Sequence, residues 1–301
     1  MQTNMEDKMK VLVTGNNGGI GRWVVQRLLE AGHTIRTLDV LAQPQSSEYE
    51  HIPGDICDLT QVRRAVQDMQ AIVHLAAVPY DINRLEAQIL DTNIHGTSNI
   101  LLAAEEAGVE RIVYFSSINA LGQAEPAHPG IYLPLDDEIP HYNVHNYSMT
   151  KHVCEEMCTA FARRGLFSVV SLRPTLVTHP GPLRYAWFRF TSEEMKMRSA
   201  LGDFWSYVDV RDVAEATLLG LTAKVEGHQA FLLTADDNRA HIPSAELVEK
   251  YYPTLPWPKI PKEAYLKRGE FISLVDCRAA KQTLGWQPKY SMFDPDAGYE
   301  D

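Results

Sequence analysis

The sequence has few cysteines, no excess of positive charge and no long apolar run, and each shortage excludes a class of protein. Four cysteines in 301 residues are too few for a disulfide framework, so we expect a reducing, cytoplasmic environment. There are 28 Lys and Arg against 39 Asp and Glu, a net charge of -11 that argues against nucleic acid or an acidic membrane surface as a partner. No apolar run approaches the length of a membrane-spanning helix, so no membrane partner is expected.

Metal-binding and secretion signals are also missing. Cys154 and Cys158 lie four residues apart on a predicted helix, and no second pair of cysteines or histidines has the spacing of a metal finger. We therefore expect buried or half-exposed thiols and no metal site. Residues 1–10 are polar and lack the apolar segment of a signal peptide, so residues 1–9 are expected to form a flexible lead-in to the first strand.

Short apolar runs alternate with amphipathic stretches along the first two-thirds of the chain, a pattern typical of βαβ units around a parallel sheet. Strands are predicted at residues 10–14, 34–39, 71–75, 111–116, 168–172 and 229–234, and helices at 19–31, 59–67, 86–107, 146–164 and 210–221. The fold class is therefore α/β, a Rossmann-type doubly wound parallel sheet with a small C-terminal substrate-binding portion. We assign residues 10–175 to the Rossmann domain and 176–301 to the smaller portion, with 207–234 returning to the core.

Residues 15–21 read Gly-Asn-Asn-Gly-Gly-Ile-Gly between an apolar strand and a helical pattern. The three glycines of a Gly-x-x-Gly-x-x-Gly motif permit a tight turn and a close approach of the backbone to a pyrophosphate at the helix N-terminus. A βα turn without a ligand is the alternative on this motif alone. The residues expected to hold the dinucleotide here are Gly15, Asn17, Gly18, Gly19, Ile20 and Gly21.

Asp39 strengthens the dinucleotide interpretation. It ends the second predicted strand about eighteen residues after Gly21, near the spacing at which a carboxylate binds the adenosine ribose hydroxyls. A carboxylate there would repel a 2′-phosphate, so NAD is favoured over NADP as the cofactor. Arg36, near the end of the same strand, is a weak indication in the opposite direction.

Tyr147 and Lys151 are four residues apart on a predicted helix, so both side chains lie on one face. A phenol titrates near pH 10 and is a poor base at neutral pH, but an adjacent ammonium and a positively charged nicotinamide ring favour the phenolate. Ser117, at the end of a predicted strand, is the candidate hydroxyl that fixes a substrate oxygen. A Tyr-x-x-x-Lys pair can arise by chance on a helix, but its place after the glycine motif and this serine indicates catalysis.

Further ordered motifs accompany these residues between positions 10 and 290. They are Gly54-Asp-Ile, His74-Leu-Ala-Ala, Asp91-Thr-Asn-Ile-His-Gly-Thr, Tyr114-Phe-Ser-Ser, Leu172-Arg-Pro, Tyr207-Val-Asp-Val-Arg-Asp-Val-Ala and Leu284-Gly-Trp-Gln-Pro. On the basis of these motifs, the chain resembles the extended short-chain dehydrogenases/reductases, that is, the NAD-dependent epimerase/dehydratase family. The resemblance implies Ser117, Tyr147 and Lys151 as the catalytic triad, and by analogy with relatives a homodimer. It implies a cofactor cleft lined, besides Tyr147 and Lys151, by Asp55, Ile56, Leu75, Ala76, Ala77 and Asn93.

Two absences narrow the reaction that this resemblance implies. The family's dehydratases carry an Asp-Glu pair just after the catalytic hydroxyl residue, whereas Ser117 is followed by Ile-Asn-Ala-Leu-Gly, so dehydration is not expected. The sugar-nucleotide epimerases place a long substrate segment before the Val-Asp-Val-Arg-Asp motif, but little more than thirty residues separate Pro174 from Tyr207 here. A small substrate is therefore expected in place of a nucleotide-linked sugar.

Within the family the nearest resemblance is to uronate dehydrogenase, which oxidises a sugar acid to its lactone with NAD. Arg184 falls close to that family's carboxylate-binding arginine, and a bidentate arginine suits a carboxylate, although a surface-loop role is an equal alternative. Two substrate-binding serines of that family correspond to Pro79 and Leu176 here, which departs from the pattern. The residues expected to contact substrate are Pro79, Ser117, Asn119 and Arg184.

The leading functional hypothesis is an NAD-dependent dehydrogenase that acts on a secondary alcohol or hemiacetal carbon of a small sugar or sugar acid. An NAD-retaining sugar epimerase, which returns the hydride to the opposite face, is the main alternative. A non-catalytic dinucleotide sensor on the same fold is the remote alternative, because it would not need the serine, tyrosine and lysine together.

Overall fold

The computed structural model describes residues 8–42, 48–79, 86–122, 131–182 and 192–300. The chain divides into two compact units. Unit 1 comprises Met1–Ser116, His145–Leu172 and Ala214–Ala230, and unit 2 comprises Ser117–Val144, Arg173–Val213 and Phe231–Asp301. The predicted division at residue 175 differs from this one, because residues 117–144 group with unit 2 and only residues 214–230 return to unit 1.

The main sheet has seven strands in the order β10-β6-β5-β4-β1-β2-β3. The strand pairings from β3 through β2, β1, β4 and β5 to β6 are all parallel, which confirms the predicted Rossmann-type α/β fold. The strands are β1 Lys10–Thr14, β2 Thr34–Asp39, β3 Glu50–Pro53, β4 Ala71–His74, β5 Arg111–Phe115, β6 Ser168–Pro174 and β10 His228–Leu233. Strand β3 was not predicted, because its four residues Glu-His-Ile-Pro are half-exposed and carry no apolar run.

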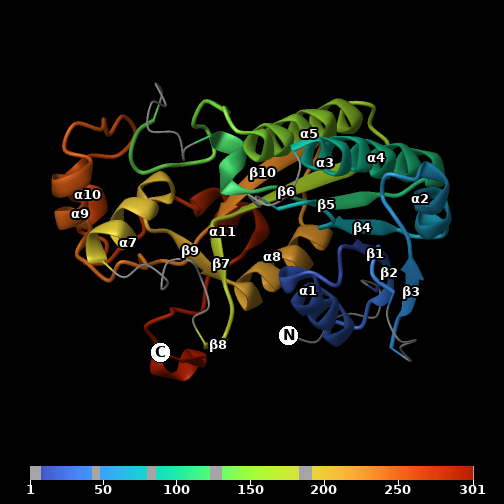
Figure 1. Cartoon of the computed structure of the whole chain (residues 1–301), viewed down its shortest axis with the longest axis horizontal. Helices are drawn as coiled ribbons and strands as arrows, with labels where there is room; N and C mark the ends of the chain where they lie inside the picture. The colour runs from blue at the N-terminus through green and yellow to red at the C-terminus, as the bar shows by residue number, and fades with distance from the viewer. Residues whose placement is uncertain (1–7, 43–47, 80–85, 123–130, 183–191, 301) are drawn as a thin grey trace. The chain divides into compact units, whose positions relative to one another are not determined.

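Helices cover both faces of this sheet within unit 1 (Figure 1). They are α1 Gly19–Glu30, α2 Leu59–Val66, α3 Glu86–Leu90, α4 Gly96–Ala107, α5 Asn146–Ala162 and α8 Val210–Thr222. Strand alternation assigns the two faces. Ile112 of β5 lies in the hydrophobic cluster that contains Ile100 of α4 and Cys154 of α5, whereas a Cβ on Gly220 of α8 would lie 3.4 Å from the side chain of Val113.

The predicted helix at 86–107 is interrupted. Residues Asp91–His95 form a π-helical turn, η2, between α3 and α4, and the Gly96 amide that follows donates its hydrogen bond to the Asp91 carbonyl. Gly96 packs tightly, since a Cβ at this position would lie 2.5 Å from Cδ1 of Ile56. Such π turns occur frequently at functional sites, and this one contains Asn93, which the sequence places beside the cofactor.

Unit 2 is built from short elements around its own core. They are β7 Leu176–Thr178, β8 Gly181–Pro182, α7 Glu193–Ser199, β9 Tyr207–Asp209, α9 Ser244–Tyr251, α10 Lys262–Leu266, α11 Arg278–Leu284 and β11 Tyr299–Glu300. Trp205 is fully buried in this core and clusters with Phe204 and Leu274. Strand β7 pairs with β9 and β8 pairs with β11, both in parallel. These strands are only two or three residues long, so they contribute few backbone hydrogen bonds, and unit 2 depends largely on side-chain contacts for its packing.

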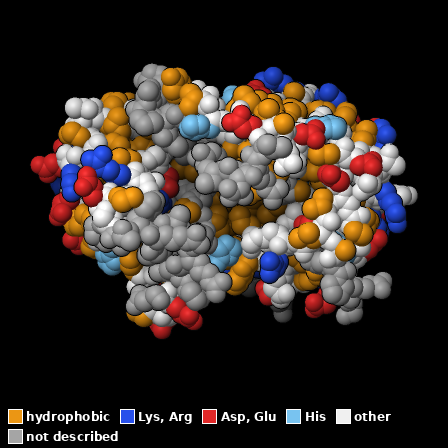
Figure 2. All heavy atoms as spheres, in the orientation of Figure 1, with side chains coloured by type: hydrophobic (Ala, Val, Ile, Leu, Met, Phe, Trp, Pro, Cys, Tyr) orange, Lys and Arg blue, Asp and Glu red, His pale blue; other side chains and the backbone are white. Residues whose placement is uncertain are grey.

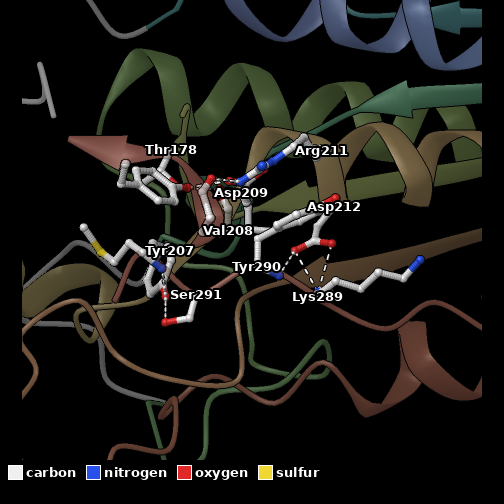
Figure 3. Close-up of polar contacts among 12 residues, drawn as sticks. Thr178, Tyr207, Val208, Asp209, Arg211, Asp212, Lys289, Tyr290 and Ser291 are labelled. Atoms are coloured by element: carbon white, nitrogen blue, oxygen red, sulfur yellow. Dashed lines mark hydrogen bonds and ion pairs between the residues drawn. The ribbon is translucent and has the colours of Figure 1, made fainter. Parts of the chain in front are cut away.

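A buried polar network organises the end of β9 (Figure 3). The fully buried Asp209 accepts hydrogen bonds from the guanidinium of Arg211, at 2.7 and 2.8 Å, and from the Tyr299 hydroxyl. Asp212 accepts from the amides of Lys289 and Tyr290 at 3.0 and 3.1 Å. Burial raises the pKa of Asp212 to about 6, and these two amides oppose the rise. The two aspartates of the Val-Asp-Val-Arg-Asp motif therefore hold the C-terminal segment of unit 2 against the end of β9 through these hydrogen bonds.

In the described part of the chain, no helix is both long enough and apolar enough to cross a membrane.

Candidate active site

The glycine turn between β1 and α1 has no room for a side chain at its first and last glycines. Gly15 adopts a φ of +74°, and a Cβ on it would lie 2.7 Å from the backbone nitrogen of Ala76. A Cβ on Gly21 would lie 2.3 Å from the Gly15 carbonyl oxygen. The turn therefore needs glycine at both positions, because the neighbouring atoms belong to the backbone and cannot move aside.

The N-terminus of α1 is suited to an anion. Gly18 at the N-cap provides no side chain to accept from the first amides, and the first turn of α1, all of which is described, contains no acidic residue. These amides and the helix dipole together favour a negatively charged group. The residues present thus fit the pyrophosphate of a dinucleotide.

Asp39 lies beside this turn at the end of β2. Its Oδ2 accepts a hydrogen bond of 3.1 Å from the Asn17 amide, and its Oδ1 accepts one of 3.0 Å from the Leu41 amide. Arg36 is engaged elsewhere, because its Nε lies 2.6 Å from Oε2 of Glu50 and its Nη1 donates to two backbone carbonyls. The charged residue of β2 that lies beside the glycine turn is therefore the negative Asp39, in agreement with a preference for NAD.

We expect Asp39→Ser to weaken NAD binding by about 10- to 100-fold, because a hydrogen bond to a charged group contributes about 1.5–3 kcal/mol. The variant should also discriminate less against NADP, because the repulsion of a 2′-phosphate is removed. Fluorescence titration with NADH and NADPH measures both affinities. Glu30→Gln is the matched control, since it removes an exposed carboxylate at the C-terminal end of α1 and should leave the ratio unchanged. An unaltered NADH-to-NADPH ratio in Asp39→Ser would refute the assigned role.

The other predicted cofactor residues lie at the ends of β3 and β4. Ile56 is buried, and its carbonyl accepts a 2.9 Å hydrogen bond from Asn99 of α4. The Ala76 amide donates to the Thr14 hydroxyl at 3.2 Å, which ties the end of β4 to the glycine turn. Leu75 and Ala77 are half-buried in the same loops, whereas Asp55 is exposed. Sequence patterns did not single out Thr14, although it immediately precedes the glycine motif.

Asn93 is fully committed to protein contacts. Its side-chain oxygen accepts from the Val78 amide at 2.7 Å, and its side-chain nitrogen donates to the Val78 carbonyl and the Thr150 hydroxyl at 3.1 Å each. The residue is 1% exposed. Asn93 therefore links the segment after β4 to Thr150 of α5, the helix that also carries Tyr147 and Lys151.

Helix α5 brings Tyr147 and Lys151 together as predicted. The ammonium of Lys151 lies 5.7 Å from the ring centroid of Tyr147 and 5.3 Å from that of Tyr114. Its Nζ donates a 2.7 Å hydrogen bond to the carbonyl of Phe115 at the end of β5. Lys151 is buried, whereas Tyr147 is half-buried. The sheet thus holds the lysine in place while part of the tyrosine stays accessible.

Burial lowers the pKa of Lys151 to about 8. At neutral pH the side chain therefore remains a cation, but one that is costly to keep in the protein interior. The buried His74 is pushed in the same direction, because burial and then the charge of Lys151 lower its pKa to about 3. His74 thus stays neutral and hydrogen-bonds to the hydroxyls of Thr14 and Thr97. Lys151 is accordingly the local positive charge at the end of β5.

The predicted substrate-side residues are distributed differently. Ser117 follows Ser116 directly and is the first residue of unit 2, where its Oγ accepts a 3.1 Å hydrogen bond from the Asn119 amide. Pro79 is exposed at the end of the segment after β4. Arg184 lies outside the described residues. Of the four, the structure brings together Ser117 and Asn119.

Unit 2 contains a cavity of about 660 Å³ between α7 and α9. Its lining mixes both charges, and the pair Arg198–Glu194 stands on α7 at 2.9 Å. On the face shown in Figure 2, Lys and Arg side chains are likewise interspersed with Asp and Glu side chains over this end of unit 2. A lining of mixed sign does not select an anionic or a cationic ligand.

Comparison with known proteins identifies the family. Residues 11–232 match the NAD dependent epimerase/dehydratase family. A Synechocystis sp. protein named as a dihydroflavonol 4-reductase is 30% identical over 237 residues, which cover 73% of this chain and 66% of that protein's length.

Solved structures share the fold. A short-chain dehydrogenase/reductase superfamily protein from Agrobacterium tumefaciens with bound NAD has a TM-score of 0.68 at 23% identity and covers 96% of this chain and 94% of its own. UDP-glucose 4-epimerase from Thermotoga maritima with UDP-glucose has a TM-score of 0.69 at 23% identity and covers 96% of each chain. With the family match, the glycine turn and the Tyr147–Lys151 pair, we conclude that the chain belongs to the NAD-dependent epimerase/dehydratase family of extended short-chain dehydrogenases/reductases, whose cofactor is NAD.

Proposed function

We propose that this protein is an NAD-dependent dehydrogenase that oxidises a secondary alcohol or hemiacetal carbon of a small sugar or sugar acid. The observation that carries the proposal is the Tyr147–Lys151 pair on α5, with the lysine ammonium anchored at the Phe115 carbonyl. A binding protein for dinucleotides would not need a half-buried phenol beside a buried cation. The pair therefore favours proton transfer over simple binding.

In the proposed reaction, Tyr147 removes the proton of the substrate hydroxyl, and the lost proton passes to solvent. NAD, when bound, would accept the hydride that leaves the carbon bearing this hydroxyl. The positive charge of Lys151 stabilises the phenolate form of Tyr147, which a low-dielectric surrounding makes more effective. Ser117, which begins unit 2 directly after β5, would hold the substrate oxygen.

Three features bear on the reaction and its substrate: two favour a small substrate, and one argues against dehydration. The segment from Leu176 to Ser206 is short, and the described part of it forms only β7, β8, α7 and one turn of 3-10 helix. The sequence after Ser117 has no acidic pair for elimination of water. The narrower resemblance to uronate dehydrogenase adds Arg184 as a candidate residue for binding a substrate carboxylate, and this role remains a prediction from sequence.

An NAD-retaining sugar epimerase is the second candidate. The likeness to the Thermotoga maritima UDP-glucose 4-epimerase over 96% of both chains favours it. Epimerisation uses the same hydride and proton transfers but returns the hydride to the opposite face. The two reactions differ in whether NADH accumulates and in whether the cofactor leaves the enzyme.

Absorbance at the NADH band, with NAD and separate panels of free aldoses, uronates and UDP-sugars, tests the proposal. We expect NADH to form with a free sugar or a sugar acid. Isomerised sugar without net NADH, together with NAD that copurifies with the protein, would assign the chain to the epimerases instead. Product analysis on the same samples separates the two outcomes.

A further inference from the structure

Three side chains of different chemistry meet in unit 1 between the loop after β3 and the π turn η2. Cys57 precedes α2, and Asp91 and His95 lie at the two ends of η2. One potential ligand atom of each residue lies within 4.8 Å of the other two. His95 Nδ1 is 3.2 Å from Asp91 Oδ1, and Cys57 Sγ is 3.8 Å from the carbonyl oxygen of Asp91.

The backbone around this cluster is held by contacts that do not use the three side chains. Asn99 of α4 donates a 2.9 Å hydrogen bond to the carbonyl of Ile56, the residue before Cys57. Gly96 packs against the Ile56 side chain so closely that a Cβ there would lie 2.5 Å away. The loop and η2 are therefore fixed relative to one another, and the three side chains start close together.

Charge at the cluster favours a cation. The carboxylate of Asp91 belongs to the cluster, and that of Asp55 accepts a 2.9 Å hydrogen bond from the Cys57 amide. The side chains of His95 and Asp91 are 55% and 66% exposed, which leaves them free to change rotamer and gives an ion access from solvent. Two carboxylates near one thiol attract a divalent ion. Burial and these carboxylates raise the pKa of the Cys57 thiol to about 11, so the ion itself must displace the thiol proton.

We propose that Cys57, Asp91 and His95 bind one divalent ion of the zinc class, with water in the fourth position. A thiolate, an imidazole and a carboxylate are the ligand types that zinc takes, whereas magnesium and calcium prefer oxygen alone. Bonds of about 2.0–2.3 Å place tetrahedral ligands roughly 3.3–3.8 Å apart. Binding releases the Cys57 proton to solvent and requires the exposed side chains to close by about 1 Å.

The ion would tie the loop after β3 to the start of α4. That loop also contains Asp55 and Ile56, which the sequence places against the adenine of NAD, and η2 contains Asn93. Metal binding and NAD binding would then affect one another, and by linkage the effect is equal in both directions. Only this coupling rests on the proposed function; the metal site itself does not.

Zinc uptake by the NAD-free, full-length protein tests the site directly. Titration of Zn²⁺ in competition with a chromophoric chelator should give one tight ion per chain. Cys57→Ser and His95→Gln should each lower the affinity at least about tenfold. Glu110→Gln, which changes an exposed carboxylate at the start of β5, is the matched control and should bind as the wild type does. Equal affinity in all four proteins would overturn the proposal.

Thiol labelling gives a second readout. Cys57 is half-buried, whereas Cys154, Cys158 and Cys277 are buried, so a mild alkylating reagent should report Cys57 in the native protein. We expect Zn²⁺ to protect this thiol and Mg²⁺ to leave it reactive. Labelling that proceeds at the same rate with and without Zn²⁺ would also overturn the proposal. Neither measurement involves turnover, so a negative result leaves the proposed dehydrogenase activity standing.

Discussion

Replacing Tyr147 with phenylalanine should lower kcat by about 10²–10⁴-fold, the usual contribution of a positioned general base. The ring and its packing are retained, so the affinity for NAD should change little. Stopped-flow or steady-state NADH formation gives kcat, and quenching of intrinsic fluorescence gives NAD affinity. The expected pattern is therefore a selective loss of turnover.

Tyr114→Phe is the matched control for this variant. The Tyr114 ring also faces the Lys151 ammonium, at 5.3 Å, but Tyr114 is 2% exposed and lies in the hydrophobic core of unit 1. Loss of its hydroxyl should leave kcat within a small factor of the wild-type value. If Tyr147→Phe kept full activity, or if both variants lost it equally, Tyr147 would not be the base.

Lys151→Met should raise the free energy of unfolding at pH 7 by about 1–2 kcal/mol while abolishing turnover. Burial lowers the pKa of Lys151 from its ordinary 10.5 to about 8, which corresponds to a cost of about 3 kcal/mol for keeping the ammonium in the native state. Loss of the hydrogen bond to the Phe115 carbonyl offsets about 1–2 kcal/mol of the gain. A protein that becomes more stable when a site residue is removed shows the usual conflict between stability and function.

The pH dependence of this gain has a definite sign. At pH 7 the lysine is protonated in both the native and the unfolded chain, so the wild type carries the whole cost. Between pH 8 and 10.5 the unfolded chain binds more protons than the native one, and the stability contributed by Lys151 rises with pH. The advantage of Lys151→Met should therefore shrink by about 2 kcal/mol between pH 7 and 9.5.

Urea denaturation of the NAD-free proteins at these two pH values measures the difference. Lys267→Met, which removes an exposed lysine at the end of α10, is the control and should show no comparable change with pH. A stability difference between Lys151→Met and the wild type that is the same at both pH values would mean that the Lys151 ammonium is not costly to bury.

The sequence alone determined the features that depend on near neighbours in the chain. Tyr147 and Lys151 share a helix face because the α-helix has 3.6 residues per turn. The glycines at 15 and 21 predict a tight turn, and in the structure a Cβ at either position would clash with the backbone. Except for β3, the order of strands and helices around the main sheet followed from alternating apolar runs, and the parallel sheet followed from that order. These features need no knowledge of contacts between distant segments.

The tertiary structure decided what depends on distant residues. Only the fold shows that Arg36 is engaged by Glu50 and so leaves Asp39 as the charge beside the glycine turn. The pKa of Lys151 depends on burial, which no local pattern of charges reveals.

Neither Cys57 nor the turn that carries Asp91 and His95 has metal-site spacing in the sequence, because Cys57 and Asp91 are 34 residues apart. The two segments meet through tertiary contacts such as the packing of Gly96 on Ile56 and the hydrogen bond from Asn99 to the Ile56 carbonyl. Likewise, Asp212 belongs to the Val-Asp-Val-Arg-Asp motif and Lys289 directly follows the Leu-Gly-Trp-Gln-Pro motif, and only the fold brings the Lys289 amide to the Asp212 carboxylate, which accepts its hydrogen bond. Local periodicity specifies the elements, whereas the close packing of those elements brings together the side chains whose chemistry depends on one another.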